Sequence, residues 1–152
     1  MVKLEGRQKI GIAITVLLVL FVSISHVISS STFFATTSTT GHLIQEGVSL
    51  YDDSDCTIPL LSIQWGTLNP GDSKNHTLYV YNNNTVSMRL NMSTSNWIPA
   101  NASDYISLTW DREDYSLAAK SSIDATLTLS IAANVTGFVD FAFDITIRGT
   151  QQ

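Results

Sequence analysis

The chain has 152 residues, which is enough for one ordinary domain with short accessory segments and too few for two full domains. Apolar residues make up 44% of it and charged residues only 14%, and Ser and Thr together number 36, so its polar character comes mainly from neutral hydroxyl groups. This composition excludes a charge-driven disordered chain, a coiled coil and a collagen. The single cysteine excludes an intramolecular disulfide framework and every metal site built from several thiolates.

Charge is distributed unevenly along the chain. The first nine residues carry three basic side chains and one acidic side chain, a net charge of +2. The remainder carries five basic and twelve acidic side chains, a net charge of −7. Because an acidic body repels phosphate backbones and offers no basic stripe, we expect no nucleic-acid partner.

Residues 10–28 form an apolar segment without Asp, Glu, Lys or Arg. As a helix its 19 residues would rise about 28 Å, close to the hydrocarbon thickness of a bilayer, about 30 Å. The densest apolar part ends at Val22, so the pattern fits both an uncleaved transmembrane anchor and a cleavable signal peptide. In both cases the basic residues 1–9 stay in the cytoplasm and the body is exported. We expect a membrane partner through residues 10–28, or a secreted body if this segment is cleaved.

Residues 29–41 follow as a linker. Nine of residues 29–40 are Ser or Thr, and such a stretch cannot bury a core. Phe33 and Phe34 interrupt it, and we interpret them as interfacial aromatic residues just outside the membrane.

From residue 42 onward, apolar and polar residues alternate with a period of two, which is typical of strands with one face on a core and one in water. Trp65 and Trp110 fall in core-facing positions of this pattern. Number and spacing of the strands predict an all-β fold, an immunoglobulin-like antiparallel β-sandwich of about seven strands over residues 42–149, preceded by a single N-terminal apolar helix. The predicted strands cover residues 43–51, 58–65, 74–81, 88–93, 106–110, 123–131 and 141–148.

Turn residues punctuate these strands. Residues 67–73 place Pro70 and Gly71 where a type II turn requires them. Residues 82–85, with three consecutive Asn, are typical of a hairpin tip with left-handed backbone, and residues 134–137 are expected to close the last hairpin.

Two stretches resemble known surface proteins. Residues 65–73 (WGTLNPGDS), followed by residues 77–84 (TLYVYNNN), resemble the opening of many prokaryotic surface sandwiches, among them archaeal membrane-anchored Ig-like proteins and the camelysin and TasA-like exported filament proteins. Residues 95–103 and 108–111 resemble small archaeal surface proteins. The resemblance extends over residues 51–149, although Asn stands where the pattern usually ends in Gly. It implies an exported sandwich fold at the cell surface and leaves activity open.

The strongest functional signal is a set of Asn-x-Ser/Thr sequons. Five of the nine Asn residues begin one, whereas composition alone would give about two. Asn75 and Asn91 are predicted on outward strand positions and the other three in turns, which gives a glycan the exposure it needs. We predict N-glycosylation, in a host that glycosylates exported chains, at Asn75, Asn83, Asn91, Asn101 and Asn134.

A few other side chains are candidates for binding. Asp52, Asp53 and Asp55 cluster in one predicted loop and are the carboxylates that would hold a cation, but the EF-hand pattern is absent, which favours a solvated turn. Trp97, predicted in a long loop, is the aromatic residue that we expect to contact a protein or glycan partner. Cys56 is either a packed thiol or the source of an intermolecular disulfide.

No catalytic motif accompanies these residues. The sequence has no Gly-x-Ser-x-Gly elbow, no His-x-x-x-His pair and no Gly-rich phosphate loop. A copper site of cupredoxin type would need His residues near the C-terminus, and the last 60 residues contain none. We therefore expect no enzyme activity and no cofactor.

Three functions stay open. The first is a non-enzymatic cell-surface protein, glycosylated and tethered to the membrane, with a structural or adhesive role. The second is a cleaved filament subunit in which an edge strand or the tail of residues 29–50 completes a neighbour's sheet, which would make the protein a homo-oligomer. The third is an extracellular module that binds a sugar or a metal ion through Trp97 or two acidic loops, residues 52–55 and residues 111–114 with Asp111, Glu113 and Asp114.

Overall fold

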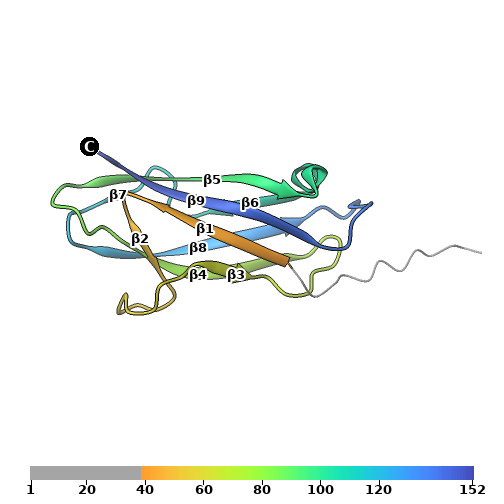
Figure 1. The fold of residues 1–152 in the computed structure, drawn as a ribbon, viewed down its shortest axis with the longest axis horizontal. Coiled ribbons are helices and arrows are strands. Elements are labelled where there is room, and N and C mark those ends of the chain that lie inside the picture. The colour runs from red at the N-terminus through yellow and green to blue at the C-terminus, as the bar shows by residue number, and fades with distance from the viewer. Residues whose placement is uncertain (1–38) are drawn as a thin grey trace, which may run out of the picture. The chain divides into compact units, whose positions relative to one another are not determined.

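A computed structural model describes residues 39–152, which fold into two β-sheets around one hydrophobic core (Figure 1). The predicted all-β class is therefore confirmed. The predicted N-terminal helix and residues 29–38 of the predicted linker lie outside the described residues. Within residues 39–152, no helix is both long enough and apolar enough to cross a membrane.

Nine strands and one short 3-10 helix make up the described part of the chain. Five strands form one sheet in the order β3-β1-β9-β5-β7, and four form the other in the order β2-β4-β8-β6. The bounds are β1 Thr39–Glu46, β2 Ser49–Tyr51, β3 Ser62–Gln64, β4 Ser73–Tyr81, β5 Met88–Ile98, η1 Ala100–Asp104, β6 Ile106–Trp110, β7 Ser116–Leu117, β8 Ser122–Ile131 and β9 Phe141–Gln151.

The chain changes sheet at every connection between strands. Odd-numbered strands belong to the five-stranded sheet and even-numbered strands to the four-stranded sheet, so no two consecutive strands of residues 39–152 pair with each other. The predicted hairpins at residues 82–85 and 134–137 are therefore wrong, because β4 and β5, like β8 and β9, lie in different sheets. These loops are crossovers between two layers, not tight turns between neighbours.

The prediction of purely antiparallel sheets is wrong at one pair of strands. β1 runs parallel to β9, from Thr39 opposite Phe141 to Glu46 opposite Arg148 (Figure 1). The other paired strands of residues 39–152 are antiparallel. Parallel neighbours need a long connection, and here seven other strands lie between the two in sequence.

Inward side chains of both sheets form the core. β8 and β9 alternate between buried and more exposed residues along most of their length, as the sequence predicted. Trp65 is buried as expected, whereas Trp110 is only partly buried. Burying one large apolar side chain contributes about 1.5–3 kcal/mol, so packing stabilises this fold. The core residues that are 1% exposed or less are Leu50, Trp65, Leu78, Val80, Leu90, Ala102, Ala125, Leu127, Leu129, Phe143, Ile145 and Ile147.

Several strand boundaries differ from the prediction, and nine strands in residues 39–152 replace the predicted seven. β1 begins at Thr39, inside the predicted linker 29–41, β3 covers only Ser62–Gln64 of the predicted 58–65, β7 was not predicted, and β9 continues to Gln151. The predicted strand at residues 43–51 is in fact two strands in different sheets, separated at Gly47. Gly47 has a φ of +72°, and a Cβ atom there would lie 2.5 Å from the carbonyl oxygen of Gly149, so a larger residue would clash at this corner. β5 is longer than predicted and includes Trp97, so the predicted position of Trp97 in a long loop is wrong.

The turn at residues 69–72 is as predicted. The backbone N–H of Asp72 donates to the carbonyl oxygen of Asn69 at 3.0 Å, and Gly71 between them has a φ of +87°, as a type II turn requires. Residues 82–84 do not adopt the left-handed backbone that was predicted for them.

Asn82, predicted at a solvated hairpin tip, is instead a buried structural residue with 0% exposure. Its Nδ2 donates to the carbonyl oxygens of Val86 (2.9 Å), Leu117 (3.1 Å) and Ala118 (3.0 Å). Its Oδ1 accepts hydrogen bonds from the backbone N–H (2.9 Å) and Nδ2 (3.1 Å) of Asn84. A buried amide with all its groups paired fixes one arrangement of the loops around it.

Candidate functional site

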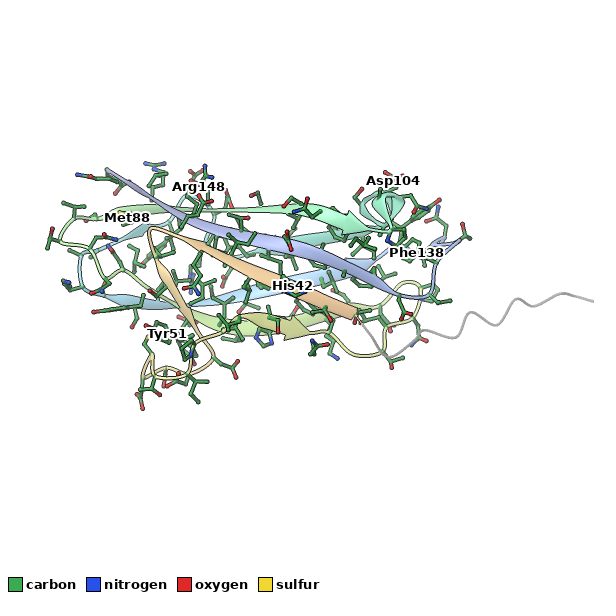
Figure 2. The ribbon with its side chains drawn as sticks, in the orientation of Figure 1. His42, Tyr51, Met88, Asp104, Phe138 and Arg148 are labelled. Carbon is green, nitrogen blue, oxygen red and sulfur yellow. The ribbon has the colours of Figure 1, made fainter. Side chains whose placement is uncertain are left out.

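The five sequon asparagines are spread over the domain and do not form one site. Asn75 is exposed on an outward position of β4. Asn83 and Asn134 are exposed in the β4–β5 and β8–β9 connections, and Asn101 is exposed in η1, the helix that ends at Asp104 (Figure 2). Asn75 therefore lies on an outward strand position as predicted, whereas Asn101, predicted in a turn, belongs to η1, and Asn83 and Asn134 lie in crossovers instead of hairpin turns.

The four exposed sequon side chains make few hydrogen bonds within residues 39–152. Asn75, Asn101 and Asn134 make no side-chain hydrogen bond to other residues of the described range 39–152. The Oδ1 of Asn83 accepts a hydrogen bond from Lys120 Nζ at 3.0 Å, which leaves its Nδ2, the atom that would carry a glycan, without a protein acceptor in this range. All four amides are open to modification in the folded domain.

Asn91 differs from the other four because its Nδ2 donates to carboxylates of the residues that follow β6. It is partly buried on β5. Its Nδ2 donates to Glu113 Oε1 at 2.9 Å and lies 3.4 Å from Asp114 Oδ1. A glycan would replace one of the two Nδ2 protons and crowd both contacts, and Asn91 is also less exposed than the other four sequon asparagines.

Glu113 closes the edge of β5. β7 pairs with only the first two residues of β5. Beyond them, Glu113 accepts a hydrogen bond from the backbone N–H of Met92 at 3.2 Å, as a neighbouring strand would, and another from Trp110 Nε1 at 2.6 Å. Burial raises the pKa of Glu113, but the hydrogen bonds from Asn91, Trp110 and Met92 outweigh it, and the net effect lowers the pKa. The carboxylate is therefore held in its ionised form.

The cation candidates Asp52, Asp53 and Asp55 lie in the loop between β2 and β3. Asp53 accepts hydrogen bonds from the backbone N–H of Thr57 (2.9 and 3.1 Å), its Oγ1 (2.7 Å) and the backbone N–H of Ile58 (2.7 Å). The bond from Ile58 is the main cause of the lowered pKa of Asp53. The carboxylate oxygens of Asp53 therefore accept hydrogen bonds from within the loop itself. Within residues 39–152, no three His, Cys, Asp or Glu side chains gather where they could hold a metal ion.

Cys56 lies in the same loop, half-buried and with a left-handed φ of 54°. Burial raises the pKa of its thiol, a hydrogen bond with Ser122 lowers it, and the charges of Asp53 and Asp55 raise it again, so that the net pKa is raised. A thiol that stays protonated at neutral pH is a weak nucleophile.

His76 points inward from β4 against Trp65, with ring centroids 6.2 Å apart. Its Nε2 is buried without a hydrogen-bond partner in residues 39–152 and lies 3.7 Å from Asp52 Oδ1. Burial lowers the pKa of His76 and Asp52 raises it, and the net effect is a lowered pKa. The imidazole is therefore neutral at pH 7, and in this environment it contributes to packing.

Trp97, the predicted partner contact, uses one ring face inside the domain. It stacks on the buried Phe143, with ring centroids 4.1 Å apart and an angle of 9° between the planes. The next residue, Ile98, is 67% exposed. At this end of β5 the exposed large apolar side chain is therefore Ile98, and Trp97 is partly buried.

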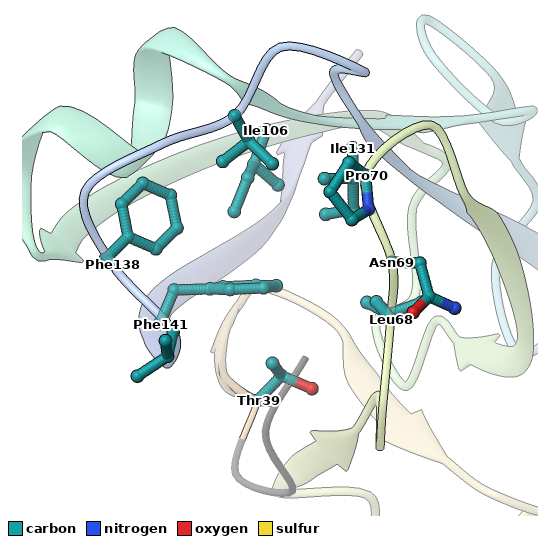
Figure 3. Close-up of a pocket in the computed structure, with 10 residues that line it drawn as sticks. Thr39, Leu68, Asn69, Pro70, Ile106, Ile131, Phe138 and Phe141 are labelled. Carbon is teal, nitrogen blue, oxygen red and sulfur yellow. The ribbon is translucent and has the colours of Figure 1, made fainter. Parts of the chain in front are cut away.

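Two hollows share Ile106 and Ile131 at one end of the sheets. The first is an apolar cavity of about 20 Å³, beside Leu68, Phe138 and Phe141 (Figure 3). That volume holds about one water molecule. The second is a solvent-open hollow of about 320 Å³ along residues 103–107 and 130–132.

Sequence reasoning missed Asn82 and Glu113. Both make contacts far away in sequence, and in the sequence Glu113 is one of several acids in a charged loop. The one local signal for Glu113 is its position three residues after Trp110, to which it hydrogen-bonds.

No protein-family model matches the chain, and no curated protein matches it. Residues 39–152 combine a closely packed core with exposed sequons and strand edges.

Proposed function

We propose that this chain is a non-enzymatic cell-surface protein, glycosylated and held to the membrane by residues 10–28, with a structural or adhesive role. The observation that supports it most directly is the exposure of Asn75, Asn83, Asn101 and Asn134 on a folded domain. N-linked glycans need such exposed asparagines and are found on exported chains. The charge pattern, +2 in the first nine residues and −7 after them, supports export of the acidic body.

The test is the intact mass and N-terminus of the full-length protein purified from its native membrane. We expect a start at Met1 or Val2 and a mass excess in hexose-sized steps. Replacing Asn75 with Gln should remove one glycan, while Asn69→Gln, which alters an exposed asparagine outside any sequon, should remove none. A start near Thr32 with the protein in the medium would contradict the anchor, and an unmodified mass would contradict the glycosylation.

We also propose that the domain is related in architecture to the exported archaeal Ig-like sandwiches that residues 65–84 resemble. Two packed sheets support this comparison. The connectivity is closer to a double-sheet jelly roll, because immunoglobulin domains pair several consecutive strands and residues 39–152 pair none.

A filament subunit, in which an edge strand or the tail of residues 29–50 completes a neighbour's sheet, is a second candidate. The described part of this tail includes β1, which here lies between β3 and β9 of its own chain. A filament built through the tail would therefore require exchange of β1 between copies, whereas one built through an edge strand would not. Electron microscopy of the medium fraction tests it: fibres with a cleaved N-terminus would support this candidate, and a membrane-bound intact chain would contradict it.

A further inference from the structure

The four-stranded sheet ends in an unprotected edge strand, β6. The other edge strands of the two sheets, β2, β3 and β7, contain only two or three residues each. β6 contains five, with no charged residue and no proline, and it pairs with β8 in unbroken register. Natural edge strands avoid pairing with other chains by being very short or by carrying charges, prolines or bulges. Among the edge strands of residues 39–152, β6 alone uses none of these devices.

The backbone of β6 presents open hydrogen-bonding groups along this edge. The carbonyl oxygen of Tyr105 accepts a hydrogen bond from the N–H of Ala132, so the odd-numbered residues here face β8. The N–H and C=O groups of Ile106, Leu108 and Trp110 therefore point away from the sheet. They have no hydrogen-bond partner among residues 39–152. Beside β5 in the other sheet, by contrast, β7, the backbone of residues 114 and 115, and Glu113 pair with the backbone from Met88 to Met92.

We propose that β6 is an interaction surface whose partner is β6 of a second copy of this chain. The two strands would run antiparallel about a two-fold axis centred on Leu108. In this register Leu108 lies opposite its own copy, Ser107 opposite Thr109, and Ile106 opposite Trp110. Apolar side chains meet apolar side chains, hydroxyls meet hydroxyls, and both open edges gain the same backbone hydrogen bonds.

Charge favours this partner. β6 itself carries no charge, so no like charges are opposed within the paired strands. Two positions beyond each end of the strand, the register brings Asp104 of one copy towards Arg112 of the other, whose guanidinium also pairs with Asp124 and Asp111 of its own chain. Asp104 lines the open hollow of about 320 Å³, which offers room for an incoming side chain. Asn75 stands on the outward face of β4, so a glycan there leaves the edge of the sheet accessible.

The test is disulfide mapping on the full-length chain in detergent, with Cys56 replaced by Ser. Two variants with different tags carry either Ser107→Cys or Thr109→Cys, both at exposed positions. Facing residues of this non-hydrogen-bonded pair have Cα atoms about 4.5 Å apart, within the range of a disulfide. Two copies of the same variant place their cysteines about 8 Å apart, which is too far. We expect a cross-linked dimer when the variants are mixed and none from either variant alone.

Three results would overturn this proposal. Cross-links in every combination would indicate random collision, and no cross-link in the mixture would exclude the register. The third is a monomer by analytical ultracentrifugation at all concentrations and at high salt, where the repulsion between two bodies of charge −7 is screened.

A second variant tests the surface without cysteines. Thr109→Lys places on β6 the charge that natural edge strands use against pairing. We expect it to reduce dimer formation at least tenfold, while Thr67→Lys, in an exposed loop, leaves it unchanged. Tryptophan fluorescence checks that both variants fold, since all three Trp residues lie in the described domain. A dimer that is unaffected by Thr109→Lys uses another surface and contradicts the proposal.

Discussion

Replacing Asn82 tests whether one buried amide holds the crossovers of this fold together. The side chain is 0% exposed, and it joins the β4–β5 loop to β7 and to the residues after β7 through the carbonyl oxygens of Leu117 and Ala118. Asn82→Ala removes both the Nδ2 donors and the Oδ1 acceptor at once. Because the bond to Leu117 is buried, its carbonyl oxygen would be left without a partner, and the part-buried groups of Val86, Ala118 and Asn84 would lose theirs.

The expected cost follows from the hydrogen bonds that Asn82 makes. Two Nδ2 protons serve three carbonyl oxygens, and Oδ1 accepts two hydrogen bonds, so about four hydrogen bonds of about 1 kcal/mol each are lost. We expect the free energy of unfolding to fall by about 3–4 kcal/mol, out of about 5–15 for a typical domain. For a domain of this size that corresponds to a melting temperature lower by about 10–15 °C.

Asn82→Asp sharpens the test because it keeps the shape and changes the chemistry. A carboxylate would face three carbonyl oxygens, so at pH 7 we expect this variant to be less stable than Asn82→Ala. Burial would raise the pKa of the new carboxyl in the folded state. The unfolding free energy should then recover, relative to the original chain, as the pH falls and the group is protonated.

The assay is tryptophan fluorescence during denaturant unfolding of the full-length chain, made in a host that does not glycosylate it. Asn134→Ala, at an exposed asparagine, is the matched control and should change the unfolding free energy by less than about 0.5 kcal/mol. A loss below about 1 kcal/mol for Asn82→Ala, or an Asp variant that is as stable as the Ala variant at pH 7, would refute the reasoning.

Three further predictions concern Glu113, His76 and Asn91. Glu113→Gln should lower the free energy of unfolding by about 1 kcal/mol at pH 7. Because folding lowers the pKa of Glu113, the original chain loses this contribution as the pH falls below 4.5 towards the folded-state pKa. Equal acid unfolding curves for both chains would contradict the role of the carboxylate. Folding also lowers the pKa of His76, so the free energy of unfolding should decrease as the pH drops below 6.5. In denaturant titrations at pH 5 and pH 7, His76→Gln should make this decrease smaller. The same decrease in both chains would contradict the assignment of this pH dependence to His76. Glycopeptide mass spectrometry should find Asn91 the least occupied sequon, and higher occupancy at Asn91 than at Asn75 would show that the contact with Glu113 is not retained.

The sequence predicts the strands and their inward faces well because alternation is a local property. β8 and β9 lie where the period of two placed them, and their apolar residues are buried. The turn at residues 69–72 was also predictable, since Pro70 and Gly71 each restrict or permit a particular backbone conformation.

The pairing of strands could not be predicted in the same way. Alternation states which face of a strand is buried and says nothing about which strand lies beside it. The parallel pairing of β1 with β9 and the change of sheet at every connection are therefore invisible in the pattern. Asn82 shows the consequence: three consecutive Asn are typical of a hairpin tip, but in a crossover the first of them is enclosed by loops from both sheets.

For the candidate sites, too, local features could be predicted from the sequence and contacts between distant residues could not. Sequons are linear motifs, so their positions follow directly from the sequence. Alternation predicted the exposure of Asn75 on β4, but Asn91, also predicted to face outward, is partly buried on β5. The difference between Asn91 and the other four depends on Glu113, which lies 22 residues further along the chain. No local pattern links the two, and only the fold shows that one sequon amide is already in use.

The charge of the strands, compared with their positions, bears on the proposed dimer. Each of the other strands of residues 39–152 with five or more residues, β1, β4, β5, β8 and β9, contains at least one charged side chain, even where it is central in its sheet. β6 contains none, although it lies at an edge where a charge would protect it. An edge strand with fewer charges than the central strands is what is expected of a strand that has another neighbour in the assembled protein. The same residues in the middle of a sheet would not indicate a partner strand, because a central strand already has two neighbours.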